Sequence, residues 1–162
     1  MKKYAILLFV LAIVSCKKEA VIDYALFSGK VTNAQGKEIT VLNDNESFKK
    51  VIKLNEDGTF SDTLKITNGN YFFHDGKTRA FLYLSQGDNL YVNFDAKDFK
   101  NSIKFDGEGA VTNNYLAAKE KVMVEIFGKS KDLYSLDEQL FVAKVNEGKS
   151  VLENMLTSTS GL

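Results

Sequence analysis

The sequence predicts a mostly β protein: an antiparallel β-sandwich of about eight strands followed by two C-terminal α-helices. Clusters of Gly, Asn and Asp, the usual turn-forming residues, recur roughly every 10 to 15 residues in the first two thirds of the chain. Between these clusters, apolar and polar residues alternate, as they do in strands with one buried face. After Gly107 the apolar spacing becomes that of a helix.

The strands are expected within residues 24–105. The clearest alternation covers residues 90–94, where every second side chain is apolar. In residues 81–84, two leucines oppose two aromatic side chains, which predicts a strand covered on both faces. The Gly-Asp turn at residues 87–88 is typical of a tight hairpin, so we expect the strands on either side of it to pair.

The first predicted helix covers residues 110–127, and Gly128 can end it. Polar residues in its first turn can cap the amides there, and the candidates are Thr112, Asn113 and Asn114. These assignments require no ligand.

The second predicted helix follows Ser135-Leu-Asp-Glu138, which has the pattern of a capping box. Gly148 lies in the middle of this helix, where it predicts a close contact or a bend. We expect the last turns to pack less tightly than the β-domain and to await a partner. One face of the helix is apolar, formed by Phe141, Val145, Leu152, Met155 and Leu156.

The first 15 residues have the features of a secretory signal. Lys2 and Lys3 precede an apolar run over residues 4–14, and the small residue Ser15 follows it. A membrane-spanning helix needs about 20 apolar residues, so this run is too short to be an anchor by itself.

Residues 13–16 (Ile-Val-Ser-Cys) resemble the lipobox of bacterial lipoproteins, although Leu and Ala or Gly are commoner than Ile13 and Ser15. The resemblance implies that Cys16 receives a diacylglyceryl group before cleavage on its N-terminal side. Two or more acyl chains anchor a protein stably. We therefore expect residues 16–22 to form a tether, and the protein to reside in a Gram-negative cell envelope, facing the periplasm.

Composition excludes several classes of function. Removing residues 1–15 takes away two of the 21 basic residues and none of the 21 acidic ones, so no basic excess remains for nucleic acid. Cys16 is the only cysteine, and lipidation would leave no disulfide, thiol nucleophile or cysteine metal site. No cofactor or metal site is expected.

No catalytic set is visible in the sequence. His74 is the only histidine and is best interpreted as a residue at a strand end or turn. A hydrolytic site would have to combine His74 with an acid and a nucleophile such as Ser85, and it ranks third among our hypotheses. We expect a protein that is not an enzyme.

Five stretches together resemble the N-terminal β-domain of TlpA-like lipoproteins of the thioredoxin family, also labelled AhpC/TSA-like. They are residues 27–31 (FSGKV), 57–60 (DGTF), 82–92 (LYLSQGDNLYV), 105–109 (FDGEG) and 113–116 (NNYL). The resemblance implies a β-sandwich and then a helical segment that leads to a thioredoxin domain with a Cys-x-x-Cys motif. Because the chain has no such motif, no redox residue is implied here.

The resemblance extends over most of the mature chain and suggests its division. We expect a β-sandwich domain at residues 23–107 and a linker-like helical segment at residues 108–162. Relative to the family, either the gene is truncated, or the sequence is a fragment, or the β-domain works alone.

Two hypotheses follow. In the leading one, the chain is a non-catalytic, membrane-tethered accessory domain that positions a thioredoxin-like domain or binds a periplasmic protein. In the alternative, it is a stand-alone envelope lipoprotein that binds a ligand or protein through its sandwich. Tyr71, Tyr83 and Tyr91 are the candidate outward-facing residues of such a surface, because tyrosine combines large contact area with a polar tip.

Overall fold

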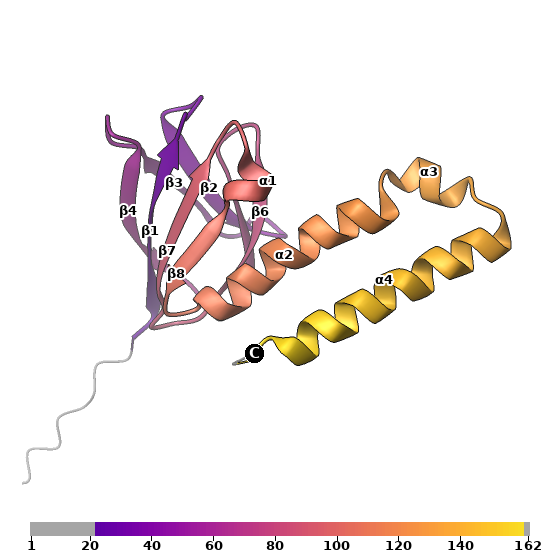
Figure 1. The fold of residues 1–162 in the computed structure, drawn as a ribbon. Helices are drawn as coiled ribbons and strands as arrows, with labels where there is room; N and C mark the ends of the chain where they lie inside the picture. The colour runs from indigo at the N-terminus through magenta and orange to yellow at the C-terminus, as the bar shows by residue number, and fades with distance from the viewer. Residues whose placement is uncertain (1–21, 161–162) are drawn as a thin grey trace, which may run out of the picture.

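The computed structural model describes residues 22–160 and confirms a β-sandwich of eight strands with long C-terminal helices (Figure 1). The expected signal at residues 1–15, the expected lipidation site Cys16 and nearly all of the expected tether lie outside the described residues. The strands form two four-stranded sheets.

The first sheet has the strand order β4-β1-β7-β8. Its strands are β1 (Tyr24–Thr32), β4 (Thr59–Lys65), β7 (Asn89–Asp95) and β8 (Lys104–Gly107). The second sheet has the order β3-β2-β5-β6. Its strands are β2 (Glu38–Asn43), β3 (Lys49–Lys53), β5 (Gly69–His74) and β6 (Arg79–Leu84).

One strand pair departs from the predicted antiparallel arrangement. All pairs are antiparallel except β1 and β7, which run parallel in the middle of the first sheet. The chain enters β7 from the other sheet and not from a neighbouring strand, so no hairpin sets its direction. Alternation within a strand reports which face is buried, and it carries no information about strand direction.

The hairpin predicted at residues 87–88 is wrong, because β6 and β7 belong to different sheets. The turn instead crosses from one sheet to the other. The Asp88 carboxylate accepts a hydrogen bond from the Ser85 amide at 2.8 Å, and the Asp88 carbonyl accepts one from Leu26 of β1, also at 2.8 Å. Gly87 has φ of 97°, which favours glycine.

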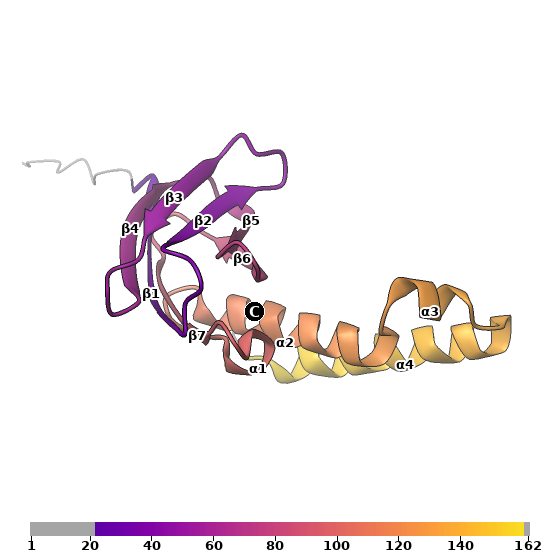
Figure 2. The ribbon, with the colours of Figure 1, turned by 90° about the horizontal axis from the view of Figure 1, so that it is seen from above.

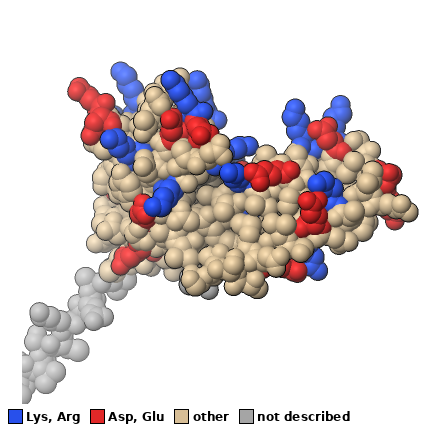
Figure 3. Space-filling view, viewed as in Figure 1, with Lys and Arg blue, Asp and Glu red and all other residues tan. Residues whose placement is uncertain are grey.

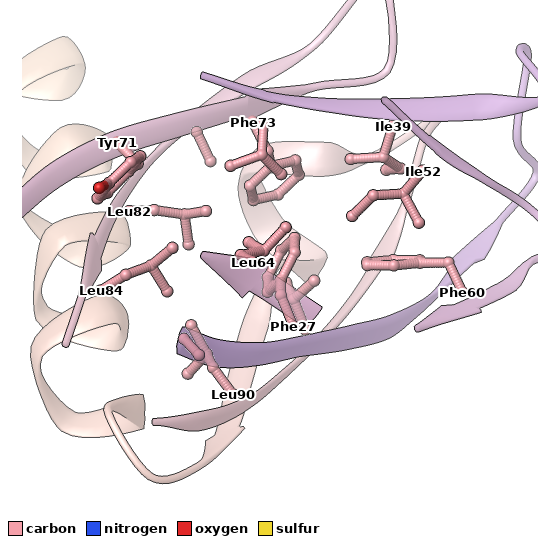
Figure 4. Packing of buried hydrophobic residues seen from close by; sticks show 14 of the residues in the cluster. Phe27, Ile39, Ile52, Phe60, Leu64, Tyr71, Phe73, Leu82, Leu84 and Leu90 are labelled. Atoms are coloured by element: carbon pink, nitrogen blue, oxygen red, sulfur yellow. The ribbon is translucent and has the colours of Figure 1, made fainter. Parts of the chain in front are cut away.

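The core lies between the two sheets and is rich in phenylalanine (Figure 4). The ring of Phe73 lies 5.8 Å from that of Phe27 and 5.7 Å from that of Phe94, measured between centroids. Leucine and isoleucine side chains from both sheets fill the remaining space. Each such side chain contributes about 1.5–3 kcal/mol to stability by leaving water.

The chain has four helices within its described part, two more than predicted. The two long ones are α2 (Ala110–Phe127) and α4 (Glu138–Ser158), and the short ones are α1 (Phe99–Ser102) and α3 (Ser130–Tyr134). In Figures 1 and 2, α2 and α4 run side by side in opposite directions and project away from the sandwich as a helical hairpin.

The predicted capping box does not begin α4. Asp137 is the N-cap, and its carboxylate accepts a hydrogen bond from the Leu140 amide at 2.9 Å. Ser135 instead follows α3, where its hydroxyl donates to the Asp132 carbonyl at 2.8 Å. Ser135 and Asp137 are both candidate capping residues and lie two positions apart. Ser135 bonds to the end of α3, and Asp137 caps α4.

Gly148 marks a close helix contact, as predicted. A Cβ atom at this position would lie 2.2 Å from Cζ of Phe127, so a larger residue would require the Phe127 ring or the helix to move. Gly148 is also the only buried residue of α4. Contacts between α2 and α4 extend to the other end of the hairpin, where Tyr115 of α2 and Met155 of α4 line one hollow.

Candidate functional site

Two neighbouring asparagines fix the position of α2 on the sandwich. The Asn113 amide accepts a hydrogen bond from the Tyr83 N–H of β6 and donates one to the Tyr83 carbonyl, both at 2.9 Å. The Asn114 amide pairs with Phe105 of β8 in the same way, at 2.9 and 2.7 Å. Since β6 and β8 are edge strands of different sheets, the first turn of α2 joins the two sheets.

These bonds correct the predicted roles of Thr112, Asn113 and Asn114 as helix caps. The N-cap position is occupied by Gly109, with φ of 86°. Asn113 is fully buried, and its side-chain amide hydrogen-bonds to the backbone of the edge strand β6. The sequence alone does not tell whether such a polar side chain caps its own helix or bonds to a strand that lies far away in the chain.

An apolar groove lies between α2 and the outer face of β5 and β6. Its volume is about 420 Å³, which falls within the range of about 300–1,000 Å³ usual for ligand sites. The Phe81 side chain forms one wall and is 48% exposed. The remaining lining residues are Asp44, Asn70, Leu116, Lys119, Glu120, Met123 and Val124.

Arg79 lies beside the groove and is the only arginine of the chain. Its guanidinium carbon lies 3.5 Å from the ring centroid of Phe72 and 5.5 Å from that of Phe81. Stacking on Phe72 orients the guanidinium group and covers a ring that would otherwise face water. No carboxylate within residues 22–160 forms an ion pair with Arg79.

A smaller hollow of about 50 Å³ adjoins the groove and shares Phe81, Leu116 and Glu120 with it. Its apolar lining comes from β6, α1, α2 and the residue after α1. The charged residues that line it are Arg79, Lys100, Lys121 and Glu120. Positive charge therefore predominates at this end of the site.

The helical hairpin also exposes apolar side chains outside the groove. Of the predicted stripe on α4, Phe141, Leu152 and Met155 are half-buried, whereas Val145 and Leu156 are exposed. Figure 3 shows few charged side chains over the lower half of one face, where β8 and the long helices lie. Further exposed apolar side chains on the hairpin are Val111, Val124, Leu140 and Val142.

The three tyrosines predicted to form a surface patch do not do so. Tyr71 is buried, with 4% exposure, and its hydroxyl donates to the Thr67 carbonyl at 2.9 Å. On β5 it is Phe72 that points outward, because Tyr71 and Phe73 share the core face. Tyr83 and Tyr91 are exposed, but they lie on strands of different sheets.

The structure also separates the residues of the third-ranked hydrolytic site. His74 ends β5 and pairs with Arg79, whereas Ser85 follows Leu84 at the opposite end of the same hairpin. The six residue steps from Arg79 to Ser85 correspond to about 20 Å along a strand. The His74 Nδ1 atom accepts a hydrogen bond from the Gly76 amide at 3.2 Å, as expected of a turn histidine.

Residues 22–160 contain no group of three or more His, Cys, Asp or Glu side chains placed to hold a metal ion. Within the same residues, no helix has the length and apolar character needed to cross a membrane.

The carboxylates with displaced pKa values belong to turns and lie outside the groove. The side-chain amide of Asn33 donates to both oxygens of Asp95 at 2.9 Å and lowers the pKa of that carboxyl. The Thr59 hydroxyl similarly lowers the pKa of Asp57. For Asp75, burial acts to raise the pKa, but hydrogen bonds from the Thr78 and Lys77 amides outweigh it and lower the pKa.

The sequence contains two signals for the groove that its interpretation did not use. The alternation in β6 places Phe81 and Tyr83 opposite the core leucines, so two aromatic residues had to face outward. The only arginine lies two residues before Phe81. No such signal existed for Leu116 and Met123, because helical spacing alone does not tell which apolar residues face a sheet and which line a groove.

No family model matches the sequence, and no curated protein shows significant similarity to it. Among solved structures, the chain is similar to a DUF3823 family protein from Parabacteroides merdae ATCC 43184. The two share 15% sequence identity over 44% of each chain, with a TM-score of 0.31. The similarity thus spans less than half the length of that protein.

Proposed function

We propose that this chain is a lipid-anchored, non-catalytic binding module of the bacterial cell envelope. Its partner would contact the groove beside β6 and the adjoining surface of the helical hairpin. The observation that carries the proposal is the apolar surface along α2, which includes Phe81 at 48% exposure and stays outside the sandwich core.

The exposed apolar residues are not required to complete the domain. The core cluster is built from the two sheets, and α2 contributes only Ala110 and Ala117 to its margin. Met123 and Val124 lie farther along α2, where they line the groove and remain exposed. Contiguous apolar surface of this kind usually marks an interaction site in a soluble domain.

The composition of the groove supports binding in preference to catalysis. Its eight lining residues include no His, Cys, Ser, Thr or Tyr. The groove therefore lacks the hydroxyl and thiol nucleophiles and the histidine base that enzymes use most often. The two carboxylates and the lysine suit the polar rim of an interface.

The sequence supports the anchor and the location. Residues 13–16 resemble a lipobox, and the tether at residues 16–22 is short. Even fully extended, such a tether reaches about 25 Å. A lipidated Cys16 would therefore hold the β-domain close to a membrane of the Gram-negative envelope, facing the periplasm.

The motif series suggests a thioredoxin-fold partner. In the TlpA-like lipoproteins that the sequence resembles, the helical segment joins the β-domain to the thioredoxin domain. An exposed apolar hairpin in the corresponding place suits an accessory domain that positions such a domain or binds one in the periplasm. The alternative is a stand-alone lipoprotein that binds another envelope protein or a ligand at the same groove.

Site-specific photocrosslinking in the native bacterium tests this function. A photoreactive phenylalanine analogue at Met123 or Val142 should yield crosslinked products, whereas one at Ser61, on the outer face of β4, should not. A thioredoxin-fold partner identified by mass spectrometry would support the accessory role, and another envelope protein would support the alternative. Equal crosslinking from all three positions, or none from Met123 and Val142, would refute the binding surface.

A further inference from the structure

Resting on the proposed binding role, we infer that the groove recognises a segment of a partner protein in which an acidic side chain lies close to a bulky apolar one. Arg79 would bind the carboxylate, and the groove formed by Phe81, Leu116 and Met123 would take the apolar side chain. This assigns a chemical class to the partner, which the binding role alone does not.

Arg79 is prepared to bind an anion. An arginine side chain has five N–H donors in a planar fork that matches a carboxylate. Stacking at 3.5 Å on Phe72 uses the face of the guanidinium group and leaves its edges available. Within residues 22–160, no ion pair with a carboxylate competes for these donors. Because stacking already restricts the Arg79 side chain, binding an anion would cost less side-chain entropy.

The charges around the smaller hollow also favour an anion. Three cationic side chains line it, those of Arg79, Lys100 and Lys121, against one carboxylate, Glu120. Lys121 has a distant partner in Glu125, at 4.0 Å on the exposed side of α2. The net positive charge beside an apolar surface is complementary to an acidic residue flanked by apolar ones.

The adjoining groove determines which kind of side chain must lie near the acidic residue of the partner. The two hollows share Phe81, Leu116 and Glu120, so the carboxylate and the apolar group must be near each other in the partner. The groove is open along the exposed side of α2, which suits a segment of a protein surface. Arginine is also among the residue types enriched at the energetically most important positions of interfaces.

Selection from a random 12-residue peptide library displayed on phage tests the inference. The full chain is held in phospholipid nanodiscs, and nanodiscs without protein remove lipid-binding peptides. Selected peptides should combine Asp or Glu with Leu, Ile, Phe or Met within a few residues. Arg79→Gln should weaken their binding about tenfold, the effect expected for losing a charge-assisted hydrogen bond. Phe81→Ala should weaken binding at least as much.

Matched controls separate the site from general effects. Lys53→Gln removes one exposed positive charge on β3, and Tyr91→Ala removes an exposed aromatic ring from the other sheet. Both should bind the peptides as wild type does. Circular dichroism melting of each variant identifies any that fails to fold. If Arg79→Gln fails to fold, Arg79→Lys replaces it, since lysine cannot both stack and bind a carboxylate in two-point fashion.

The outcomes distinguish this inference from the binding role. Peptides that depend on Phe81 but not on Arg79, or that lack acidic residues, would overturn the inference and leave the binding role standing. Failure to select any Phe81-dependent peptide would overturn the inference, whereas the crosslinking experiment decides the binding role independently. If sedimentation shows a dimer that Phe81→Ala dissociates, the occupant is a second copy of the chain and the inference is wrong.

Discussion

The side-chain amide of Asn113 forms both hydrogen bonds that a neighbouring strand would form with Tyr83. Its oxygen accepts from the Tyr83 N–H, and its nitrogen donates to the Tyr83 carbonyl, each at 2.9 Å. The nitrogen also donates to the Gly109 carbonyl at 2.9 Å. Because an edge strand has no further strand to satisfy its outer backbone groups, this one side chain both ends the sheet and fixes α2.

We expect Asn113→Ala to lower the free energy of unfolding by about 2–4 kcal/mol, since it leaves the N–H and the carbonyl of Tyr83 without their partners. Asn113→Asp should be similarly destabilising, because a carboxylate oxygen would face the Tyr83 and Gly109 carbonyls. Urea unfolding monitored by circular dichroism measures both effects. Asn101→Ala, which removes an exposed amide near α1, is the control and should change stability little. Equal stability of all the variants would contradict the proposed role of Asn113.

We expect Gly148→Ala to loosen the helical hairpin, even though alanine favours a helix by about 1 kcal/mol over glycine. The added methyl group would meet the Phe127 ring, and overpacking of this kind costs about 1–3 kcal/mol. Hydrogen exchange across α4 should become faster while exchange in β7 stays unchanged. Combining the change with Phe127→Leu should restore slow exchange by making room. Ser150→Ala, on an exposed position of α4, controls for helix propensity, and a Gly148→Ala variant that behaves like it would show that the contact is unimportant.

In the wild-type chain, amides at residues 150–158 should exchange faster than those at residues 90–94. Leu90, Val92 and Phe94 are buried in the core, whereas the end of α4 has no buried residue. Regions with few buried contacts open at lower free energy. Mass-spectrometric hydrogen exchange on the monomeric chain measures the difference. Equal protection of the two segments would mean that the hairpin is as firmly packed as the sandwich.

Asn33→Gly should raise the pKa of Asp95 toward its ordinary value of 3.8, because it removes the two hydrogen bonds from the Asn33 amide. Glycine tolerates the φ of 55° at this position, so the backbone is kept. A lowered folded-state pKa stabilises the fold above the unfolded-state pKa, and this stabilisation is lost as pH falls through the folded value. The variant should therefore lose less stability than wild type as pH falls below about 4.

Carbon-13 NMR titration of the carboxyl groups measures that change directly. Asp57 is the internal control, because its pKa is lowered mainly by the Thr59 hydroxyl and should not respond to Asn33→Gly. An unchanged pKa at Asp95 would show that the amide of Asn33 is not the cause.

Cys16→Ser should abolish incorporation of a labelled fatty acid and release the chain from the membrane fraction, since a serine cannot form the thioether of a lipoprotein. Metabolic labelling followed by gel fluorography provides the measurement. Ser28→Ala, within β1, is a control that keeps the cysteine and should be labelled as wild type is. Label incorporated equally by the Cys16→Ser chain would disprove the lipobox interpretation.

Much of the local structure could be predicted from the sequence. The alternation in residues 90–94 correctly gave the buried face of β7, and the bounds of α2 agree with the predicted 110–127. The prediction that the strand at residues 81–84 is covered on both faces is wrong, because Phe81 and Tyr83 are exposed. The errors concern interactions between distant elements. Tyr71 was predicted to face outward, but in β5 the side chains of both residues 71 and 73 face the core and Phe72 does not.

The candidate site lay almost entirely beyond sequence reasoning. Phe81 and Leu116 are far apart in the chain and meet only because Asn113 fixes α2 beside β6. The stacking of Arg79 on Phe72 likewise depends on the register that pairs β5 with β6. Neither contact has a local signature, since each residue type is common in ordinary strands and helices.

The sequence by itself determined which side of a clearly alternating strand such as β7 is buried and where the long helices run, because side-chain periodicity is a local property of backbone geometry. The tertiary structure decided the rest: that the turn at residues 85–88 crosses between sheets, that β1 and β7 run parallel, and that Asn113 serves a strand edge instead of a helix end. These outcomes depend on which distant backbone groups need hydrogen-bond partners, and that need arises only when the two sheets have packed together.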